Sequence, residues 1–219
     1  MAIRVLFVCT GNTCRSSMAE ALMRRLVESR AAGEGAGGAV RAAGDATGAA
    51  IDIEVKSAGT GAHDGGPASD NAIAVMRELG IDLRGHRSRR LTQDLVDWAD
   101  LILTMTASHK MYVTRTFRRA DAKTFTLGEY AVSPGNSAAP PAGAAGGSAA
   151  GQEGAPGDAA GSRVGTPRPA APLEVEDPYG RPVDTYRRVA EEIEKALASA
   201  YERMAREAAG GMPGARRDA

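Results

Sequence analysis

The residues best suited to chemistry lie near the start of the chain, where a cysteine and an arginine are separated by five residues. Cys9 follows an apolar run over residues 3–8 that is typical of a buried strand, and Arg15 and Ser16 precede a helical pattern. A loop between a strand and a helix presents backbone N–H groups and the positive end of the helix dipole, which together attract an anion. The guanidinium of Arg15 can bind two oxygens of that anion. The spacing predicts a phosphate-binding loop that contains a nucleophilic thiol.

Cys9 is predicted to be that nucleophile. The positive field that binds an anion also favours the thiolate, which is the form that attacks phosphorus. Attack gives a cysteinyl-phosphate, and water then hydrolyses it. The alternative, a buried structural cysteine at a strand end, leaves the neighbouring Gly11-Asn12 and Arg15-Ser16 pairs unexplained. We expect Arg15 to stabilise the equatorial oxygens of the transferring phosphoryl group.

The loop residues themselves are predicted to bind phosphate, mainly through their backbone N–H groups. Asn12 tolerates left-handed backbone angles better than most residues, which suits a tight anion-binding turn. Ser16 has two interpretations, a cap of the following helix or a hydroxyl that donates to the sulfur of Cys9 and holds it ionised. The predicted phosphate-binding residues are Thr10, Gly11, Asn12, Thr13, Cys14 and Ser16.

The chain has only two cysteines, Cys9 and Cys14, which are too close in sequence to staple the fold and too few for a structural zinc site. We expect no metal and no cofactor. Two interpretations of Cys14 stay open. It is either a small buried residue at the base of the loop, or a redox partner that captures oxidised Cys9 as a disulfide before irreversible oxidation proceeds.

The overall charge gives no reason to expect nucleic acid or an anionic membrane as a partner. Lys and Arg together number 27, as do Asp and Glu, so any anion site must be local. The sequence contains no apolar stretch of about 18 residues, and its start passes into a strand pattern without the regions of a signal peptide. We therefore expect a cytoplasmic protein that binds neither nucleic acid nor membrane.

Strand and helix patterns alternate along the chain, which predicts an α/β fold with a parallel sheet and right-handed crossovers. The first and third predicted strands are nearly continuous apolar runs, as suits strands buried on both faces. The predicted strands cover residues 3–8, 53–58, 101–105 and 124–126. The predicted helices cover residues 17–30, 70–79, 92–98, 107–117 and 184–208.

A single domain is expected over residues 1–209. Two stretches within it, at about 31–50 and 133–172, consist largely of Ala, Gly, Pro and Ser and have almost no large apolar side chains. Such sequence cannot offset the entropy lost on ordering, so we predict flexible insertions. Residues 210–219 follow a helix stop at Gly210-Gly211 and are predicted to be a disordered tail.

Taken together, these residues resemble the low-molecular-weight protein tyrosine phosphatase family, and within it the bacterial protein-arginine phosphatase branch. The resemblance covers roughly two-thirds of the chain and implies a three-layer fold, in which helices cover both faces of a four-stranded parallel sheet. Besides the loop, it is carried by Met18-Ala19-Glu20-Ala21, Ser57-Ala58-Gly59, Gly80-Ile81, His86, Arg89, the strand over 101–105, Phe125-Thr126-Leu127 and Asp177-Pro178-Tyr179-Gly180.

The resemblance also implies roles for two residues far from the loop in sequence. Asp177 would give a proton to the departing group in the first step and take one from water in the second. By itself, Asp-Pro is a common turn opener. His86 would join the network through which Asn12 holds the shape of the loop, although a lone histidine is more often only a satisfied polar side chain.

Thr13 bears on the substrate, because the resemblance associates threonine there with arginine phosphatases and a larger aliphatic residue with tyrosine phosphatases. We therefore expect phosphorylated proteins as partners and phosphoarginine as the substrate, with a tyrosine phosphatase of the same family as the alternative. Arsenate reductases of this fold need cysteines downstream, and none follows Cys14. A non-catalytic phosphate-binding regulator is a further alternative, against which Cys9, Arg15 and Asp177 all argue.

Overall fold

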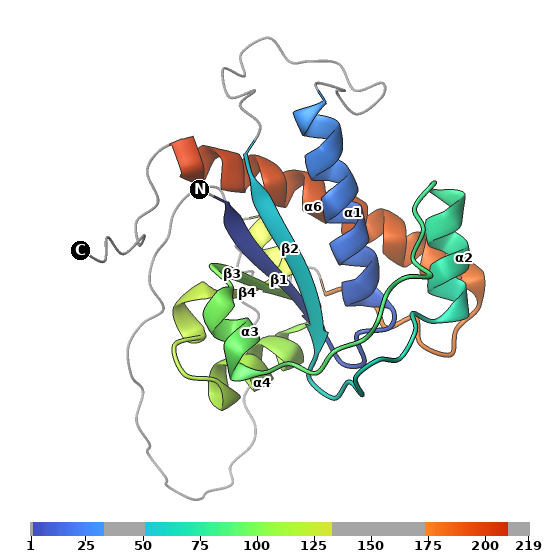
Figure 1. Cartoon of the computed structure of the whole chain (residues 1–219), viewed down its shortest axis with the longest axis horizontal. Coiled ribbons are helices and arrows are strands. Elements are labelled where there is room, and N and C mark those ends of the chain that lie inside the picture. Colours follow the sequence, from blue (N-terminus) through green and yellow to red (C-terminus); the bar gives the residue numbers. More distant parts are fainter. Residues whose placement is uncertain (1, 33–50, 133–173, 210–219) are drawn as a thin grey trace, which may run out of the picture.

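A parallel four-stranded sheet forms the centre of the computed structural model, which describes residues 2–32, 51–132 and 174–209 (Figure 1). The strand order is β2-β1-β3-β4, and every neighbouring pair is parallel. This arrangement confirms the predicted sheet. The strands are β1 (Ile3–Cys9), β2 (Ile53–Gly59), β3 (Leu101–Thr104) and β4 (Thr124–Thr126).

Helices cover both faces of this sheet, so the predicted three-layer architecture is also confirmed. One face packs against α1, α2, α5 and α6, and the other packs against α3 and α4. The helices are α1 (Arg15–Ala31), α2 (Asp70–Glu78), α3 (Gln93–Trp98), α4 (Ala107–Thr116), α5 (Leu127–Val132) and α6 (Val183–Ala209), with a 3₁₀ turn, η1 (Asp121–Lys123).

Strand β1 is buried on both faces, which explains its nearly continuous apolar sequence. Val5 and Phe7 belong to the core beneath α1 and α6, whereas Leu6 and Val8 belong to the core beneath α3 and α4. All four side chains are fully buried. The strand that leads into the cysteine loop is therefore enclosed between the two helical layers.

Helix α6 has the apolar stripe predicted from its sequence. Val189, Ile193, Leu197 and Tyr201 are buried at steps of four residues, as expected for one face of a helix. The short helix α5 and the turn η1 were not predicted, because six and three residues are too few to show a helical period. None of the helices in the described part of the chain is long and apolar enough to cross a membrane.

The two predicted insertions and the predicted tail lie outside the described residues, apart from Ala31 and Ala32. Ala31 is the last residue of α1, and Ala32 is its C-terminal cap. The single domain, the flexible insertions at 31–50 and 133–172 and the disordered tail at 210–219 therefore stay predictions.

Gly59, at the end of β2, fixes how closely the cysteine loop approaches the sheet. It pairs with Cys9 across the strands. A Cβ atom added at Gly59 would lie 2.4 Å from the carbonyl oxygen of Thr10 and 2.9 Å from the backbone nitrogen of Asn12. Both neighbours are backbone atoms, which cannot turn aside as a flexible side chain could. The loop shape thus requires glycine at this position.

We predict that Gly59→Ala lowers the free energy of unfolding by about 2 kcal/mol or more, as expected for overpacking against backbone. Because the displaced atoms belong to the cysteine loop, turnover should fall as well. Urea denaturation measures the first effect. The matched control is Gly85→Ala, where an added Cβ meets nothing within 4 Å. Equal unfolding midpoints for the two variants would show that the loop backbone can shift to accommodate the added Cβ at little cost.

Candidate active site

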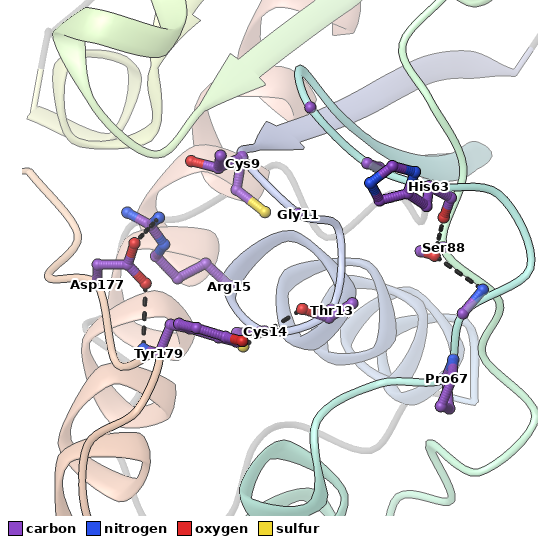
Figure 2. Close-up of a pocket in the computed structure, with 14 residues that line it drawn as sticks. Cys9, Gly11, Thr13, Cys14, Arg15, His63, Pro67, Ser88, Asp177 and Tyr179 are labelled. Carbon is purple, nitrogen blue, oxygen red and sulfur yellow. Dashed lines mark hydrogen bonds and ion pairs between the residues drawn. The ribbon is translucent and has the colours of Figure 1, made fainter.

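A cleft of about 440 Å³ opens at the carboxyl end of β1 (Figure 2). Ligands of parallel α/β sheets characteristically bind at this edge. The loop between β1 and α1 forms one part of its lining, and residues from three distant segments form the rest. The lining residues are Cys9, Thr10, Gly11, Thr13, Cys14, Arg15, Gly61, Ala62, His63, Gly66, Pro67, Ser88, Asp177 and Tyr179.

The sulfur of Cys9 lies in the loop with two polar partners. It is 2.9 Å from the hydroxyl oxygen of Ser16, and the backbone N–H of Asn12 donates to it over 3.3 Å. Only 2% of the Cys9 surface is exposed. Both neighbours can donate to a negatively charged sulfur, so they favour the nucleophilic form of the residue.

Ser16 is not the cap of the helix, so that interpretation is wrong. Helix α1 begins at Arg15, its N-cap is Cys14, and no side chain makes a capping hydrogen bond there. Ser16 is already inside the first turn, where its hydroxyl contacts the Cys9 sulfur and accepts a hydrogen bond from Nδ2 of Asn12 over 3.0 Å. The alternative interpretation, a hydroxyl directed at the sulfur, agrees with this geometry.

Asn12 connects the loop to the end of β2. Its φ angle is 56°, in the left-handed region that asparagine tolerates better than most residues, and its side chain is fully buried. Its Nδ2 group donates to the hydroxyl of Ser57 over 2.7 Å as well as to Ser16. The hydroxyl of Ser57 in turn donates to the carboxylate of Glu20 in α1.

A second set of contacts ties Asn12 to residues 86–89. Its Oδ1 atom accepts from the backbone N–H of Arg89 over 2.9 Å, and its carbonyl oxygen accepts from Nε2 of His86 over 2.7 Å. Burial lowers the pKa of His86, although the hydrogen bond to Asn12 opposes that effect. His86 therefore contacts the Asn12 network, as the resemblance implied, and it is not among the residues that line the cleft.

Arg15 and Asp177 face each other across one side of the cleft, although 162 positions separate them in the chain (Figure 2). The Nη2 atom of Arg15 is 2.7 Å from Oδ2 of Asp177, and Nη1 donates to the carbonyl of Val175 over 3.3 Å. The guanidinium is buried, whereas the Asp177 side chain is 54% exposed. The backbone N–H of Tyr179 also donates to the Asp177 carboxylate.

Two hydrogen bonds hold the segment that carries Asp177 against the sheet edge. The N–H of Val175 donates to the carbonyl of Met105, just beyond β3, over 3.0 Å. The carboxylate of Glu174 accepts from the N–H of Ala107, in the first turn of α4, over 2.8 Å. The end of β3 and the start of α4 therefore place Asp177 beside the loop.

Thr13 and Cys14 occupy the side of the loop that faces α2 and α6. The carbonyl of Thr13 accepts from the N–H of Ser69, the N-cap of α2, over 2.9 Å. Cys14 is buried, and its sulfur lies 3.3 Å from the Ser69 hydroxyl and 3.4 Å from that of Tyr186. Burial raises the pKa of Tyr186 to about 12. Both cysteines are free thiols, and a redox role for Cys14 stays a prediction.

Sequence reasoning missed His109, a buried histidine in the first turn of α4. Its Nε2 atom is 2.9 Å from the hydroxyl of Thr10, and its Nδ1 atom is 2.8 Å from the hydroxyl of Thr106. Burial, followed by the charge of Arg15, lowers the pKa of His109 to about 4. The one available signal was a histidine close to the carboxyl end of a predicted strand, where the helix after it begins.

The groups that meet in the cleft fit phosphoryl transfer. A sulfur with two donors lies beside a buried guanidinium, whose Nε has no hydrogen-bond partner among the described residues, and a carboxylate lies opposite. Within residues 2–32, 51–132 and 174–209, no cluster of His, Cys, Asp and Glu side chains is placed to hold a metal ion.

Comparisons with known proteins agree with this geometry. The chain is 32% identical to a protein-arginine-phosphatase of Geobacillus stearothermophilus, over 93% of this chain and 97% of the relative. It is 36% identical to a probable low molecular weight protein-tyrosine-phosphatase, EpsP, of Ralstonia solanacearum, over 57% of this chain and 70% of the relative.

A solved structure shows the same fold. It is the YwlE arginine phosphatase, in a mutant form with a phosphorylated active-site serine. That structure matches with a TM-score of 0.65 and 28% sequence identity, and the match covers 92% of this chain and 95% of the other. The family model described as low molecular weight phosphotyrosine protein phosphatase matches residues 4–139. The chain therefore belongs to the low molecular weight phosphotyrosine protein phosphatase family.

Proposed function

We propose that this protein hydrolyses phosphoarginine in phosphorylated proteins, with Cys9 as the nucleophile, Arg15 as the phosphate-binding cation and Asp177 as the acid and base. The observation that carries the proposal is the meeting of these three side chains at one cleft, with the Cys9 sulfur held by Ser16 and Asn12. Family membership supports a cysteine-dependent phosphatase. We further propose that the protein acts in the cytoplasm.

In the first step, the phosphoryl group lies in the loop, with its oxygens on backbone N–H groups and on the Arg15 guanidinium. The Cys9 thiolate attacks phosphorus, a S–P bond forms, and the N–P bond to the arginine side chain breaks. Asp177 gives its proton to the departing nitrogen. The products of this step are the cysteinyl-phosphate and an unmodified arginine.

In the second step, water attacks the cysteinyl-phosphate. Asp177, now ionised, takes a proton from the water as its oxygen bonds to phosphorus. The S–P bond breaks, the thiolate returns with its donors Ser16 and Asn12 in place, and inorganic phosphate leaves. The same carboxylate serves both steps because the leaving group and the water occupy the same side of phosphorus in turn.

Substrate binding must rearrange the ion pair between Arg15 and Asp177. In the structure, Oδ2 of Asp177 contacts Nη2 of the guanidinium. A phosphoryl group carries two negative charges and can take that position. Asp177 is half exposed, so once displaced it can take up a proton from solvent and turn towards the leaving group as the acid. Phosphate binding would then place Cys9, Arg15 and Asp177 in the arrangement that the reaction needs.

Two observations support phosphoarginine over phosphotyrosine. Thr13 lines the cleft, where its hydroxyl adds polarity and its smaller bulk suits a planar guanidinium better than a phenol ring. The relative that matches this chain over nearly its full length is named as an arginine phosphatase. Phosphotyrosine is the second candidate, because a tyrosine phosphatase is also a relative and exposed Tyr179 offers an aromatic surface at the cleft.

A rate comparison decides between the two substrates. The same peptide is prepared with phosphoarginine or with phosphotyrosine at one position, and kcat/KM is measured for both. We expect the phosphoarginine peptide to be preferred. A higher kcat/KM on the phosphotyrosine peptide would assign the protein to tyrosine dephosphorylation. No turnover of either peptide or of an aryl phosphate would instead favour a non-catalytic phosphate-binding regulator.

Replacing the nucleophile should separate catalysis from binding. We predict that Cys9→Ser lowers kcat by about 10⁴-fold or more, because a neutral hydroxyl is a far weaker nucleophile than a thiolate. Binding of inorganic phosphate should change little, since the backbone N–H groups and Arg15 remain. Turnover is measured with 4-nitrophenyl phosphate, and phosphate binding by calorimetry. A variant with wild-type turnover would remove Cys9 from the mechanism.

Removing the acid should affect poor leaving groups most. We predict that Asp177→Asn slows hydrolysis of the phosphoarginine peptide by about 10²- to 10⁴-fold, because the departing nitrogen then lacks a proton donor. The loss on 4-nitrophenyl phosphate, whose leaving group needs less help, should be smaller. Asp184→Asn, at an exposed carboxylate in the first turn of α6, is the matched control. Equal losses on both substrates would place the acid elsewhere.

Enlarging Thr13 should shift the substrate preference. We predict that Thr13→Ile lowers the ratio of kcat/KM for phosphoarginine over phosphotyrosine by about tenfold, since it deletes a hydroxyl and adds apolar bulk to the cleft. Thr13→Ser, which keeps the hydroxyl, should hold the ratio closer to that of the wild type. The idea fails if the isoleucine and serine variants both retain the wild-type ratio.

A further inference from the structure

Thr10 and His109 form a hydrogen-bonded pair that the mechanism above does not use. The hydroxyl of Thr10 is 2.9 Å from Nε2 of His109. Thr10 is exposed and lines the cleft, whereas His109 is only 8% exposed and lies behind it in α4. A buried imidazole therefore supports an accessible hydroxyl at the cleft wall.

The imidazole is fixed at both of its nitrogen atoms. Nδ1 is 2.8 Å from the hydroxyl of Thr106, the N-cap of α4, and the same hydroxyl accepts from the backbone N–H of His109 over 3.3 Å. The ring cannot turn without breaking contacts on both sides. Its position, and hence the direction from which it contacts Thr10, is set by the start of the helix.

This imidazole is neutral near pH 7. Burial is the main cause of the low pKa of His109, about 4, and the positive charge of Arg15 adds to it, while Asp177 and Glu174 oppose it. A neutral imidazole has one N–H group and one lone pair. The Thr10 hydroxyl has one hydrogen and two lone pairs, and His109 uses only one of these three. Either tautomer therefore leaves Thr10 with at least one lone pair for a ligand.

The pair lies on the side of the cleft where the leaving group is expected. The carboxylate of Glu174, three residues before Asp177, accepts from the N–H of Ala107, which lies with His109 in the first turn of α4. This turn is therefore close to the segment whose carboxylate would protonate the departing atom. In phosphoarginine that atom belongs to a guanidinium, which is rich in N–H donors. The ester oxygen and ring of phosphotyrosine offer no such donor.

We propose that the Thr10 hydroxyl accepts a hydrogen bond from a guanidinium N–H of phosphoarginine, which makes Thr10 a specificity-determining residue and His109 the positioning residue that acts through it. This inference rests on the proposed function, and it assigns a second polar contact to the substrate side chain besides that of Thr13. A neutral partner behind Thr10 also avoids an additional positive charge beside the cationic guanidinium.

The first test is Thr10→Val, which removes the hydroxyl while keeping the shape of the side chain. On the phosphoarginine peptide, kcat/KM should fall by about tenfold, the loss expected for one hydrogen bond to a charged group. On the matching phosphotyrosine peptide, the loss should be clearly smaller, because the backbone N–H of Thr10, which would bind the phosphoryl group of either substrate, is kept. Thr114→Val, in the same helix as His109 but not in the cleft lining, is the matched control and should leave both rates unchanged.

The second test asks whether His109 acts through Thr10. His109→Met should reproduce the selective loss on phosphoarginine, and the double variant with Thr10→Val should lose no more than Thr10→Val alone. His109→Gln should restore part of the preference, since its amide can still contact the Thr10 hydroxyl. Melting temperatures of all variants are measured, because a merely structural role for His109 would lower both rates and stability without changing the ratio.

The outcomes separate this inference from the proposed function. If the wild type prefers phosphoarginine and Thr10→Val keeps that preference, the inference is overturned and the proposed function stands. If the wild type prefers phosphotyrosine, both are overturned. If His109→Met lowers the preference equally in the presence and absence of the Thr10 hydroxyl, His109 does not act through Thr10, and its positioning role is overturned.

Discussion

The shape of the cysteine loop depends on one buried side chain, that of Asn12. Its left-handed backbone turns the chain, its N–H donates to the Cys9 sulfur, and its amide reaches both the hydroxyl beside that sulfur and the end of β2. The contacts to His86 and Arg89 bring in a third segment. Because each of these polar groups is buried or partly buried, leaving any of them unpaired would be costly, so the network holds the loop in one form.

Two different parts of the chain position the sulfur of Cys9 and the guanidinium of Arg15 on one side, and the carboxylate of Asp177 on the other. Local sequence supplies the sulfur and the cation, since Cys9 ends β1 and Arg15 begins α1. The carboxylate comes from far along the chain and reaches the loop through contacts of Val175 and Glu174 with the region that follows β3. A buried network therefore holds the Cys9 side of the site, whereas Asp177 is exposed and joins the site through a few polar contacts.

Much of this could be predicted from the sequence, because short-range patterns determine it. The apolar run before Cys9, the spacing of Cys9 and Arg15 and the stripe along α6 each reflect local geometry. The function of Asp177 came from a family resemblance, since an Asp-Pro pair has no distinctive local meaning. The assignment of Ser16 as a helix cap was wrong because Cys14, one residue before the helix, occupies that position.

Two of the contacts that sequence reasoning missed join residues that are distant along the chain. Ninety-nine positions separate Thr10 from His109, and 172 separate Cys14 from Tyr186. No periodicity or spacing in the sequence predicts either contact, because crossovers of the parallel sheet bring the partners together. The polar contacts around the loop therefore depend on the order in which the strands pair. The phosphate-binding pattern itself can be read from eight consecutive residues, Cys9 to Ser16.

The ion pair between Arg15 and Asp177 has a consequence for product release. The Asp177 carboxylate pairs with the Arg15 guanidinium, so this buried cation has a partner within the protein itself. If Arg15 binds the phosphoryl group as proposed, Asp177 competes with the phosphate product for the same guanidinium. Because its side chain is half exposed, the pair is a weak one, and a doubly charged phosphoryl group can still displace it. In the proposed mechanism, this competition would favour release of phosphate while still allowing the substrate to bind.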